Sequence, residues 1–559
     1  MKFAVREGAA AERPEVRRAR RSRLASARAP GQSGTEGNSQ MHRIRPTRTR
    51  AAHALAALLL ALLAVACSDA TGGGSADPLR LPALHAEPDP LAGGRIVDAE
   101  GREVLLRGVN VNALAEYWVS GEFPTVFPFT DEDAELIAGI GWNAVRLLLS
   151  WSRVEPTPGV YDEAYLDEAA AAVRALAARG VYSIVDLHQD AWGPTLAARP
   201  GEECPTTGEP ALGWDGAPGW ATFDGGAPRC STAGIRETSP AVVAAFTALW
   251  NDAPGPDGVG IRTRYARMLG HVAGRFARET AVAGYDLMNE PNAFTSAAQE
   301  GLAQMYADAL REIRAAERAA GGFPHLVVFE PSALWSAVGR GAPPGFVRDR
   351  DVVYGPHVYT GGINAASLTR DNFVVARDEA ALFGGAPVLV GEWGSGPNRA
   401  EDPDDRYFLF HQELQDEFRF GATLWTWRES CGDPHKTADY RAGRIPYVWG
   451  EFEVDCRTNA ITGPRQPLID QLTRGWVRAA PGPLEVLRWQ HESGVLEASG
   501  AAAVGGQEML AFYPAARLGA PQVSVVGLDE LRAVPAAGGN VLLVARAAGG
   551  DWWLSARPW

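Results

Sequence analysis

The sequence of 559 residues predicts an α/β fold: a (β/α)8 TIM barrel followed by a small C-terminal antiparallel β-sandwich. Three observations lead to this prediction. Eight short apolar segments alternate with helical patterns between residues 103 and 427, as in repeated βα units. These segments are apolar almost throughout, which is typical of parallel strands buried on both faces. From about residue 478 the chain changes to short strands separated by Gly, Ala and Pro turns, without a helical stretch.

The predicted elements follow in chain order. The barrel strands are expected at 103–112, 143–151, 181–190, 282–290, 325–331, 351–359, 386–393 and 421–427. Helices are expected at 130–141, 162–180, 261–278, 296–318 and 404–421, where apolar residues recur at helical spacing. Helix 162–180 has Asp162 near its start and Gly180 at its end, which fits the residue preferences of helix ends. The alternative, a doubly wound open sheet, would have a glycine-rich first turn that this sequence lacks.

The N-terminal region carries the basic residues of the chain. Residues 1–66 contain 13 Lys and Arg against four Glu, so a formal net charge of −14 leaves −23 on the rest. An acidic body argues against nucleic acid as a partner. Residues 1–40 predict disorder or an over-extended start, with Met41 as the start of translation. From Met41 a basic flank and the apolar run "AAHALAALLLALLAVA" lead to Cys67, as in a secretory signal peptide.

The segment "LAVAC" resembles a bacterial lipobox, which implies that Cys67 is lipidated and that the protein is exported to the cell envelope. The alternative, a membrane-spanning helix, needs about 20 apolar residues, and the run is shorter. We therefore predict a signal region over 1–66, a Gly/Ser/Pro-rich tether over 67–90, a barrel domain over 91–475 and a sandwich over 476–559. We expect a monomer held at a membrane by its lipid.

Four further cysteines predict two disulfides. An even number of cysteines in an exported chain favours disulfide bonds. Proximity in the sequence pairs Cys204 with Cys230 and Cys431 with Cys456, and each loop of about 25 residues would add about 3 kcal/mol. A zinc site is the alternative, but the sequence has no CxxC or HxxxH spacing. We expect neither a metal nor a cofactor.

Two predicted strands end at a glutamate and then break into Pro or Gly. They are "VAGYDLMNEPN", with Glu290, and "APVLVGEWGS", with Glu392. The carboxyl ends of all strands in a (β/α)8 barrel meet at one mouth, so both glutamates would face one cleft. Two carboxyl groups across a cleft are what glycoside hydrolysis requires. A single such glutamate is more often a structural partner of an arginine, but two in the same context favour catalysis.

The neighbours of the glutamates suggest supporting roles. Asn289 is placed to bond a sugar 2-hydroxyl, and His357 and Tyr359 end the sixth predicted strand, where the phenol of Tyr359 could donate to the nucleophile. Arg146 on the second strand would enter the mouth near Glu392 and lower its pKa, because a buried arginine needs a carboxylate partner.

Other strand ends supply candidate sugar-binding groups. His188 and Asp190 end the third strand and could bind sugar hydroxyls. Trp425 and Trp427 end the eighth strand, and we expect Trp425 to be the flat face on which a sugar ring stacks, with Trp427 in the core.

The motifs "NAVRL", "DLHQD", "NEP", His-x-Tyr, "GEW" and "LWTW", in this order, resemble glycoside hydrolase family 5. The resemblance covers roughly residues 95–430 and implies a retaining double displacement without metal, with Glu290 as acid/base and Glu392 as nucleophile. It also carries over to the positions that match the family motifs: Arg146, His188, Asn289, His357 and Tyr359.

Within that family the chain looks most similar to the endoglycoceramidases, through "VDLHQDAWG", an insertion containing "DGAPGWAT", and "FEPS". This resemblance implies cleavage of the β-bond between a glycan and ceramide. Trp214 and Trp220 of the insertion either wall an apolar trough or pack on the barrel. Endoglycoceramidases often carry a basic residue shortly after the first strand, whereas "NVNALAEYW" offers Glu116 and Tyr117. That departure leaves room for a simple glucolipid or a steryl glucoside.

Three rival functions remain. They are a cellulase- or mannanase-like endo-β-glycanase, a β-glucosidase acting on aryl or steryl glucosides, and a non-enzymatic carbohydrate-binding lipoprotein. The presence of both glutamates counts against the last.

Overall fold

The computed structural model describes residues 77–117, 121, 123–206, 208–232, 235–346, 349–363, 366–435 and 448–559. The predicted signal region, Cys67 and the first part of the tether lie outside the described residues. Among the described residues, no helix is both long and apolar enough to cross a membrane.

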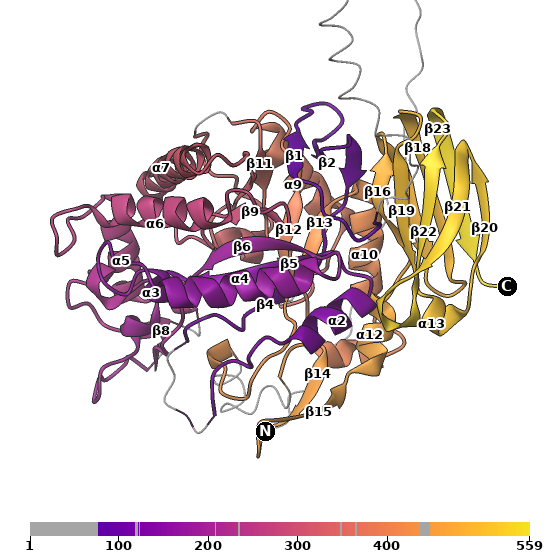
Figure 1. Cartoon of the computed structure of the whole chain (residues 1–559). Helices are drawn as coiled ribbons and strands as arrows, with labels where there is room; N and C mark the ends of the chain where they lie inside the picture. Colours follow the sequence, from indigo (N-terminus) through magenta and orange to yellow (C-terminus); the bar gives the residue numbers. More distant parts are fainter. Residues whose placement is uncertain are drawn as a thin grey trace, which may run out of the picture. The chain divides into compact units, whose positions relative to one another are not determined.

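Eight parallel strands form the central sheet, and the predicted barrel is confirmed (Figure 1). The hydrogen-bonded order is β11-β10-β9-β6-β5-β4-β13-β12, and a parallel bridge between Tyr354 and Val388 joins the two ends into a closed cylinder. The strands are β4 (Arg107–Val111), β5 (Ala144–Ser150), β6 (Tyr182–His188), β9 (Val282–Asp286), β10 (Leu326–Phe329), β11 (Val352–Tyr354), β12 (Leu389–Trp393) and β13 (Gly421–Leu424).

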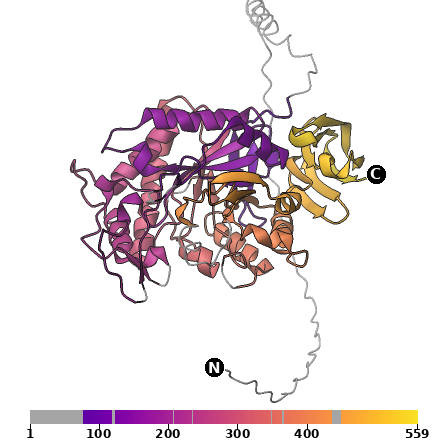
Figure 2. The same ribbon diagram turned by 90° about the horizontal axis from the view of Figure 1, so that it is seen from below.

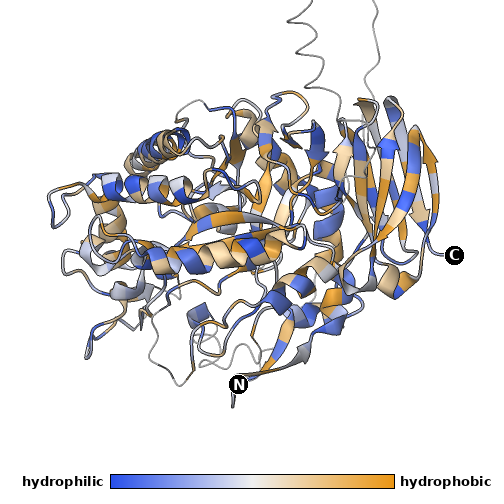
Figure 3. Cartoon of the chain, in the orientation of Figure 1, coloured by the Kyte–Doolittle hydropathy of each residue, from blue (hydrophilic) through white to orange (hydrophobic). Residues whose placement is uncertain are grey.

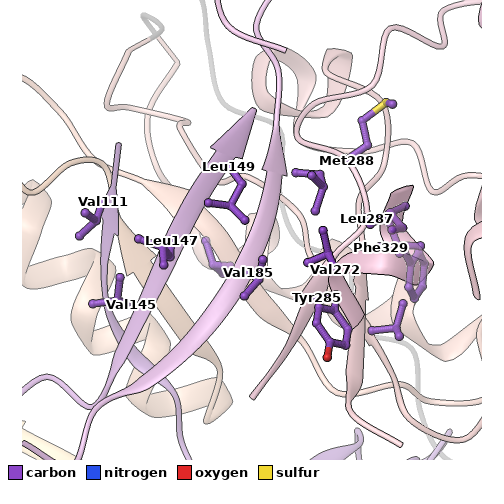
Figure 4. Close-up of a cluster of buried hydrophobic side chains, with 14 of the residues drawn as sticks. Val111, Val145, Leu147, Leu149, Val185, Val272, Tyr285, Leu287, Met288 and Phe329 are labelled. Atoms are coloured by element: carbon purple, nitrogen blue, oxygen red, sulfur yellow. The ribbon is translucent and has the colours of Figure 1, made fainter. Parts of the chain in front are cut away.

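Side chains of β5 alternate between two environments because successive residues of a strand point to opposite faces. Val145, Leu147 and Leu149 belong to the apolar layer that includes residues of the surrounding helices (Figure 4). Arg146 and Leu148 lie between them and point into the barrel, where Leu148 contacts the aromatic pair Tyr359 and Trp425. The strand thus delivers a charged side chain to the interior while its other face forms the main core.

Helices follow most of the strands. The principal ones are α2 (Asp131–Gly139), α4 (Glu163–Ala177), α5 (Pro240–Trp250), α6 (Ile261–Phe276), α7 (Ser296–Ala319), α9 (Arg370–Ala381) and α10 (Tyr407–Phe418). Shorter ones are α3 (Trp151–Val154), α8 (Leu334–Val338), α12 (Gln466–Leu472) and α13 (Ala515–Leu518). The side chain of Asp162 caps α4, whose residues alternate in hydropathy (Figure 3). All five predicted helices are present; α5 and α9 were not predicted.

Two antiparallel sheets build the C-terminal sandwich (Figure 2). Their strands are β16 (Trp476–Pro481), β17 (Leu484–Gln490), β18 (Val495–Ala503), β19 (Glu508–Tyr513), β20 (Gln522–Val526), β21 (Leu528–Pro535), β22 (Val541–Ala547) and β23 (Gly550–Arg557). The seven-stranded sheet also takes in three strands that precede the barrel: β1 (Leu84–Glu87), β2 (Arg95–Asp98) and β3 (Arg102–Val104). The boundaries predicted at 91 and 476 therefore miss the N-terminal part of the sandwich.

The predicted strand 103–112 is in fact two strands. β3 pairs with β16 through Val104 and Ala479, whereas β4 begins at Arg107 and belongs to the barrel. Buried sandwich residues share a core with Ala144, Leu326 and Leu389, which lie at or near the amino ends of barrel strands. The sandwich therefore covers the end of the barrel opposite to the mouth at which active sites of this fold lie.

Both predicted disulfides are present. Cys204 and Cys230 have Cα atoms 5.7 Å apart, and Cys431 and Cys456 have theirs 5.4 Å apart. The first disulfide closes the insertion after β6, which contains the short hairpin β7 (Gly208–Pro210) and β8 (Cys230–Thr232). The second ties the segment after β13 to the hairpin β14 (Phe452–Asp455) and β15 (Ala460–Pro464).

Candidate active site

The carboxyl ends of the barrel strands open into a cleft of about 920 Å³. Glu290 and Glu392 lie in its wall together with His188, Tyr359 and Trp425. These residues come from or follow five different strands, as expected where the strand-end loops of a barrel converge. The candidate residues that were far apart in the sequence therefore share one cavity.

Glu392 lies on β12, and each of its carboxyl oxygens has a donor. Arg146 Nη1 donates to Oε1 and Tyr359 Oη donates to Oε2, both at 2.8 Å. One oxygen of Glu392, one of Glu290 and a ring nitrogen of His357 lie within 4.8 Å of one another. Retaining glycosidases hold their two carboxyl groups about 5–5.5 Å apart, and inverting ones about 6.5–9.5 Å apart. The observed spacing suits direct attack by a carboxylate.

Arg146 is completely buried on β5 and faces four carboxylates. Besides Glu392 it contacts Asp186 at 2.9 Å, Asp286 at 3.0 Å and Glu330 at 2.9 Å. A buried charge is stable only when it is paired and hydrogen-bonded, and this guanidinium uses all three of its nitrogens. Arg146 thus holds together four strand ends as well as orienting Glu392.

Glu290 follows β9 by four residues, at a sharp turn. Its φ of 37° lies in the left-handed region, which costs a residue with a Cβ about 1–2 kcal/mol. The surroundings hold this backbone: Glu330 Oε2 accepts the Glu290 N–H at 2.8 Å, and Asn289 is fixed by Arg146 Nη2 at 3.0 Å and by the carbonyl of Gln189 at 3.0 Å. The "NEP" turn is therefore built to aim Glu290 into the cleft.

His357 lies between Glu290 and Glu330. Its Nδ1 is 3.0 Å from Glu290 Oε1, and its Nε2 is 3.1 Å from Glu330 Oε1. A neutral imidazole has one N–H. If it is on Nε2, Nδ1 accepts a proton carried by Glu290 Oε1; if it is on Nδ1, it donates to Oε1 and the proton of Glu290 lies on Oε2. If the ring is protonated, both nitrogens donate and Glu290 is ionised. His357 and Glu290 therefore share one proton.

The pKa shifts of His357 and Glu290 indicate which of the two holds the shared proton. Burial alone would lower the pKa of His357, but Glu330, Glu392 and the hydrogen bond to Glu290 raise it well above the usual value. Burial alone would raise the pKa of Glu290, but hydrogen bonds from His357 and Ser336 hold it below the usual value. The shared proton is thus held mainly by the imidazole, next to the Glu290 oxygen.

Burial raises the pKa of Glu392, although the charges of His357 and Arg146 oppose the rise. The nearby charge of Glu290 adds to it. Because the guanidinium and the phenol both donate to Glu392, and Glu290 has the proton-bearing His357 as its neighbour, we assign the ionised role to Glu392.

His188 and Trp425 form one wall of the cleft. His188 Nδ1 is 2.7 Å from Asp186 Oδ2, and its ring is stacked on Trp425 with centroids 5.5 Å apart. Trp427 points the other way, into the main core, where its Nε1 donates to Asp133 at 2.8 Å. Of the two candidate tryptophans, the structure places Trp425 at the cleft.

Asp190 is held by two cations at the same end of the cleft. Arg236 Nη2 lies 2.5 Å from Asp190, and His435 Nε2 lies 3.1 Å from it. Arg236 also lies over the ring of Trp214, 4.2 Å from its centroid. Trp214 is buried beneath Arg236, and Trp220 packs against Trp151 in the core; neither is among the residues that line the cleft. The trough alternative for these two residues is wrong.

Sequence reasoning missed several groups that the structure brings to the site. Asp286 ends β9 and Glu330 follows β10, which is the signal used for Glu290 and Glu392, and Asp186 lies two residues before the end of β6. Loop residues gave no such signal, because they follow no periodic pattern. The missed residues are Asp186, Asp286, Glu330, Ser336, Arg236 and His435.

Three groups of residues at or near the cleft, within the described part of the chain, are of metal-ligating type. They are Glu290, His357 and Glu392; His188, Asp190 and Asp215; and Glu429, Asp433 and His435. In the first group, a shared proton and the guanidinium of Arg146 already balance the carboxylates. The absence of a metal stays a prediction.

A closed (β/α)8 barrel with two facing carboxyl groups at its mouth defines the class of glycoside hydrolases that work through a pair of acidic residues. The model of glycosyl hydrolase family 5, described as cellulase, matches residues 97–430. The chain belongs to glycosyl hydrolase family 5.

Within this family, the chain is similar to several enzymes named for their action on glycolipids. Endoglycoceramidase I of Rhodococcus hoagii is 31% identical over 291 residues, which are 48% of this chain and 52% of that protein. A crystal structure of an endogalactoceramidase is 36% identical, with a TM-score of 0.74, over 86% of this chain and all of that one. The structure of endo-glycoceramidase II from Rhodococcus sp. in complex with ganglioside GM3 is 25% identical, with a TM-score of 0.63. The match covers 85% of this chain and 100% of that one. The chain spans about half the length of the Rhodococcus hoagii relative.

Proposed function

We propose that the protein is a retaining β-glycoside hydrolase that cleaves glycolipids between the glycan and a lipid such as ceramide. The observation that carries this proposal is an apolar rim beside Glu290, the carboxyl group that shares a proton with His357. Phe294 lies four residues after Glu290, and Leu334 and Ile363 come from the next two strand-end loops; all three are exposed and line the cleft. His188 and Asp190 give another part of the cleft a polar wall. A sugar on the polar wall and a lipid against the apolar rim would place the bond between them at the glutamates.

The first half-reaction transfers the glycan to the enzyme. A carboxylate oxygen of Glu392 bonds to the anomeric carbon as the bond from that carbon to the glycosidic oxygen breaks. The electron pair goes to the oxygen, which takes the proton from Glu290 and leaves as the hydroxyl of the lipid. Arg146 and Tyr359 keep Glu392 ionised and oriented for this attack.

The second half-reaction releases the glycan. Glu290, now ionised, takes a proton from water as the water oxygen bonds to the anomeric carbon, and the ester bond to Glu392 breaks with its electrons returning to the carboxylate. Two inversions give net retention. Asn289 is fixed beside Glu290 by Arg146 and the Gln189 carbonyl, and we propose that its remaining amide N–H bonds the sugar 2-hydroxyl.

The substrate is tested by incubating the protein with a glycosphingolipid in detergent. We expect free glycan and intact ceramide. Cello-oligosaccharides released from cellulose, with no ceramide from the glycolipid, would favour the endo-β-glycanase instead. Replacing Phe294 or Leu334 by Ser should raise KM for the glycolipid and leave an aryl β-glycoside unaffected.

The mechanism is tested by removing each glutamate. Glu392→Ala should abolish turnover of an aryl β-glycoside while sugar binding survives. Glu290→Ala should be slow in the second half-reaction and be rescued by azide as a β-glycosyl azide; an α-azide would mean inversion. Glu132→Ala, at an exposed position on α2, is the matched control and should be fully active.

We propose further that the protein is exported, lipidated on Cys67 and held at the cell envelope as a monomer. The apolar run before Cys67 and the pairing of all four other cysteines support export, because disulfides form in oxidising compartments. Metabolic labelling with a fatty acid in a bacterial host should mark the wild type and not Cys67→Ser. Labelling of the variant, or none of either, would contradict the anchor. Sedimentation of the detergent-solubilised protein tests the monomer.

A further inference from the structure

A five-residue helix joins the apolar rim to the acid. α8 (Leu334–Val338) follows β10 and carries two cleft residues with a buried residue between them. Leu334 is exposed at the cleft, Trp335 is buried, and Ser336 lines the cleft. The indole Nε1 of Trp335 donates to Glu379 on α9 at 2.8 Å, which fixes the helix.

Ser336 contacts the acid directly. Its Oγ donates to Glu290 Oε1 at 2.5 Å, and His357 Nδ1 lies 3.0 Å from the same oxygen. Oε2 of Glu290 has no hydrogen-bond partner in the described part of the chain. One oxygen of the carboxyl group is thus held from two sides, and the other is left for the substrate.

We propose that Ser336 is a positioning residue that turns Glu290 so that Oε2 gives its proton to the glycosidic oxygen. This inference rests on the proposed function. When Glu290 is the acid, Oε1 accepts from Ser336 Oγ–H and from Nδ1–H of a neutral His357, so the acid proton lies on Oε2. It passes from Oε2 to the glycosidic oxygen as the bond from that oxygen to the anomeric carbon breaks and its electron pair moves to the oxygen. Ser336 itself forms and breaks no covalent bond. Leu334 lies on α8 together with Ser336. The same short helix therefore both contacts the lipid and orients Glu290.

The role of Ser336 should depend on the leaving group. A lipid alcohol leaves only with a proton, whereas dinitrophenolate leaves readily without one. We expect Ser336→Ala to lower kcat/KM about 10- to 100-fold for a glycolipid or an alkyl β-glycoside, as for loss of a hydrogen bond to a charged group. For a dinitrophenyl β-glycoside the first half-reaction should change by less than about threefold, because general acid catalysis is not needed there.

The pH profile gives a second readout. The hydrogen bond from Ser336 lowers the pKa of Glu290, so its loss should raise that pKa. Activity on the alkyl glycoside is lost as pH rises through the pKa of the acid, so the basic limb of Ser336→Ala should move to higher pH. A residue that only supported the fold would not move it.

The experiment compares wild type, Ser336→Ala, Ser336→Thr and Leu334→Ala on both substrates, with thermal unfolding as a check on folding. Ser336→Thr keeps the hydroxyl and should restore most activity and the original basic limb. Leu334→Ala should raise KM for the lipid and leave the pH profile unchanged. The inference would be overturned if Ser336→Ala lost kcat/KM equally on the alkyl and the dinitrophenyl β-glycoside, or lost it on neither. The wild type would still support the proposed function in that case. A wild type that cleaves neither substrate overturns both.

Discussion

Replacing Tyr359 by Phe tests the assignment of Glu392 as the nucleophile. Tyr359 Oη donates to Glu392 Oε2 at 2.8 Å, and both residues are buried. This hydrogen bond is strongest when the carboxylate is charged and weak when it is an ester. The carboxylate loses charge in the first half-reaction and regains it in the second. Tyr359→Phe should therefore slow the second half-reaction more than the first.

The size of the effect follows from the contact. A buried hydrogen bond to a charged group contributes about 1.5–3 kcal/mol. Since about 1.36 kcal/mol corresponds to tenfold in rate, the second half-reaction should slow roughly 10- to 100-fold. The rate of the first half-reaction should change less. The hydrogen bond from Tyr359 also stabilises the charged Glu392 before it attacks, so losing the bond makes the nucleophile more reactive as well.

Stopped-flow kinetics on a dinitrophenyl β-glycoside measure both steps. We expect a burst of about one equivalent of dinitrophenolate, followed by slow turnover, with kcat and KM falling together. The acidic limb of kcat/KM should move to higher pH: burial already raises the pKa of Glu392, the loss of a donor raises it further, and the nucleophile must be ionised to attack.

Tyr182→Phe is the matched control, because its hydroxyl donates to the carbonyl of Pro82 at 2.8 Å at the other end of the barrel. It should leave all rates unchanged. If Tyr359→Phe lowers kcat/KM as much as kcat and shows no burst, the hydrogen bond does not stabilise the departing carboxylate and the assignment of Glu392 is refuted.

Three further predictions concern stability. Arg146→Gln leaves four buried carboxylates without their cation and should cost about 3–5 kcal/mol in urea unfolding; an unchanged midpoint would contradict the role of this guanidinium. Replacing Cys204 and Cys230 together by Ser should cost about 3 kcal/mol, and reducing agent should then lower the midpoint less than in the wild type. Burial lowers the pKa of His411 from 6.5 to about 3, so below pH 6.5 the unfolded chain binds a proton that the folded chain does not, and stability falls as pH falls. His411→Gln should flatten this decline, and an unaltered pH dependence would exclude His411 as its source.

The barrel and its two glutamates could be predicted because both depend on local pattern plus one geometric rule. Eight apolar segments are visible without any knowledge of contacts, and the rule that strand ends converge at one mouth places Glu290 and Glu392 together. The same rule applied to Asp286 and Glu330 would have added two of the carboxylates around Arg146. They were missed because each looks like an ordinary polar residue until the position of the guanidinium is known.

The sandwich and the cleft wall depend on contacts between distant parts of the chain. β3 pairs with β16 across more than 370 residues, as Val104 with Ala479, and no local pattern specifies that partner. Arg236 and His435 reach Asp190 from two loops. Since loops follow no period of 2 or 3.6 residues, sequence patterning could not assign these side chains to the site.

The distribution of charge explains how Glu290 can act first as an acid and then as a base. Arg146 supplies one positive charge to a region with four carboxylates, so a second ionised glutamate beside Glu392 is unfavourable unless His357 bears a proton. The pair His357 and Glu290 therefore retains one proton while Glu392 is charged. When Glu392 becomes an ester, one of the charges that raise the pKa of His357 disappears, and so does the repulsion between the two glutamates. The affinity of the pair for its proton falls at that moment. Glu290 can then stay ionised after giving its proton to the leaving group and accept another from water, so the covalent step itself switches its role.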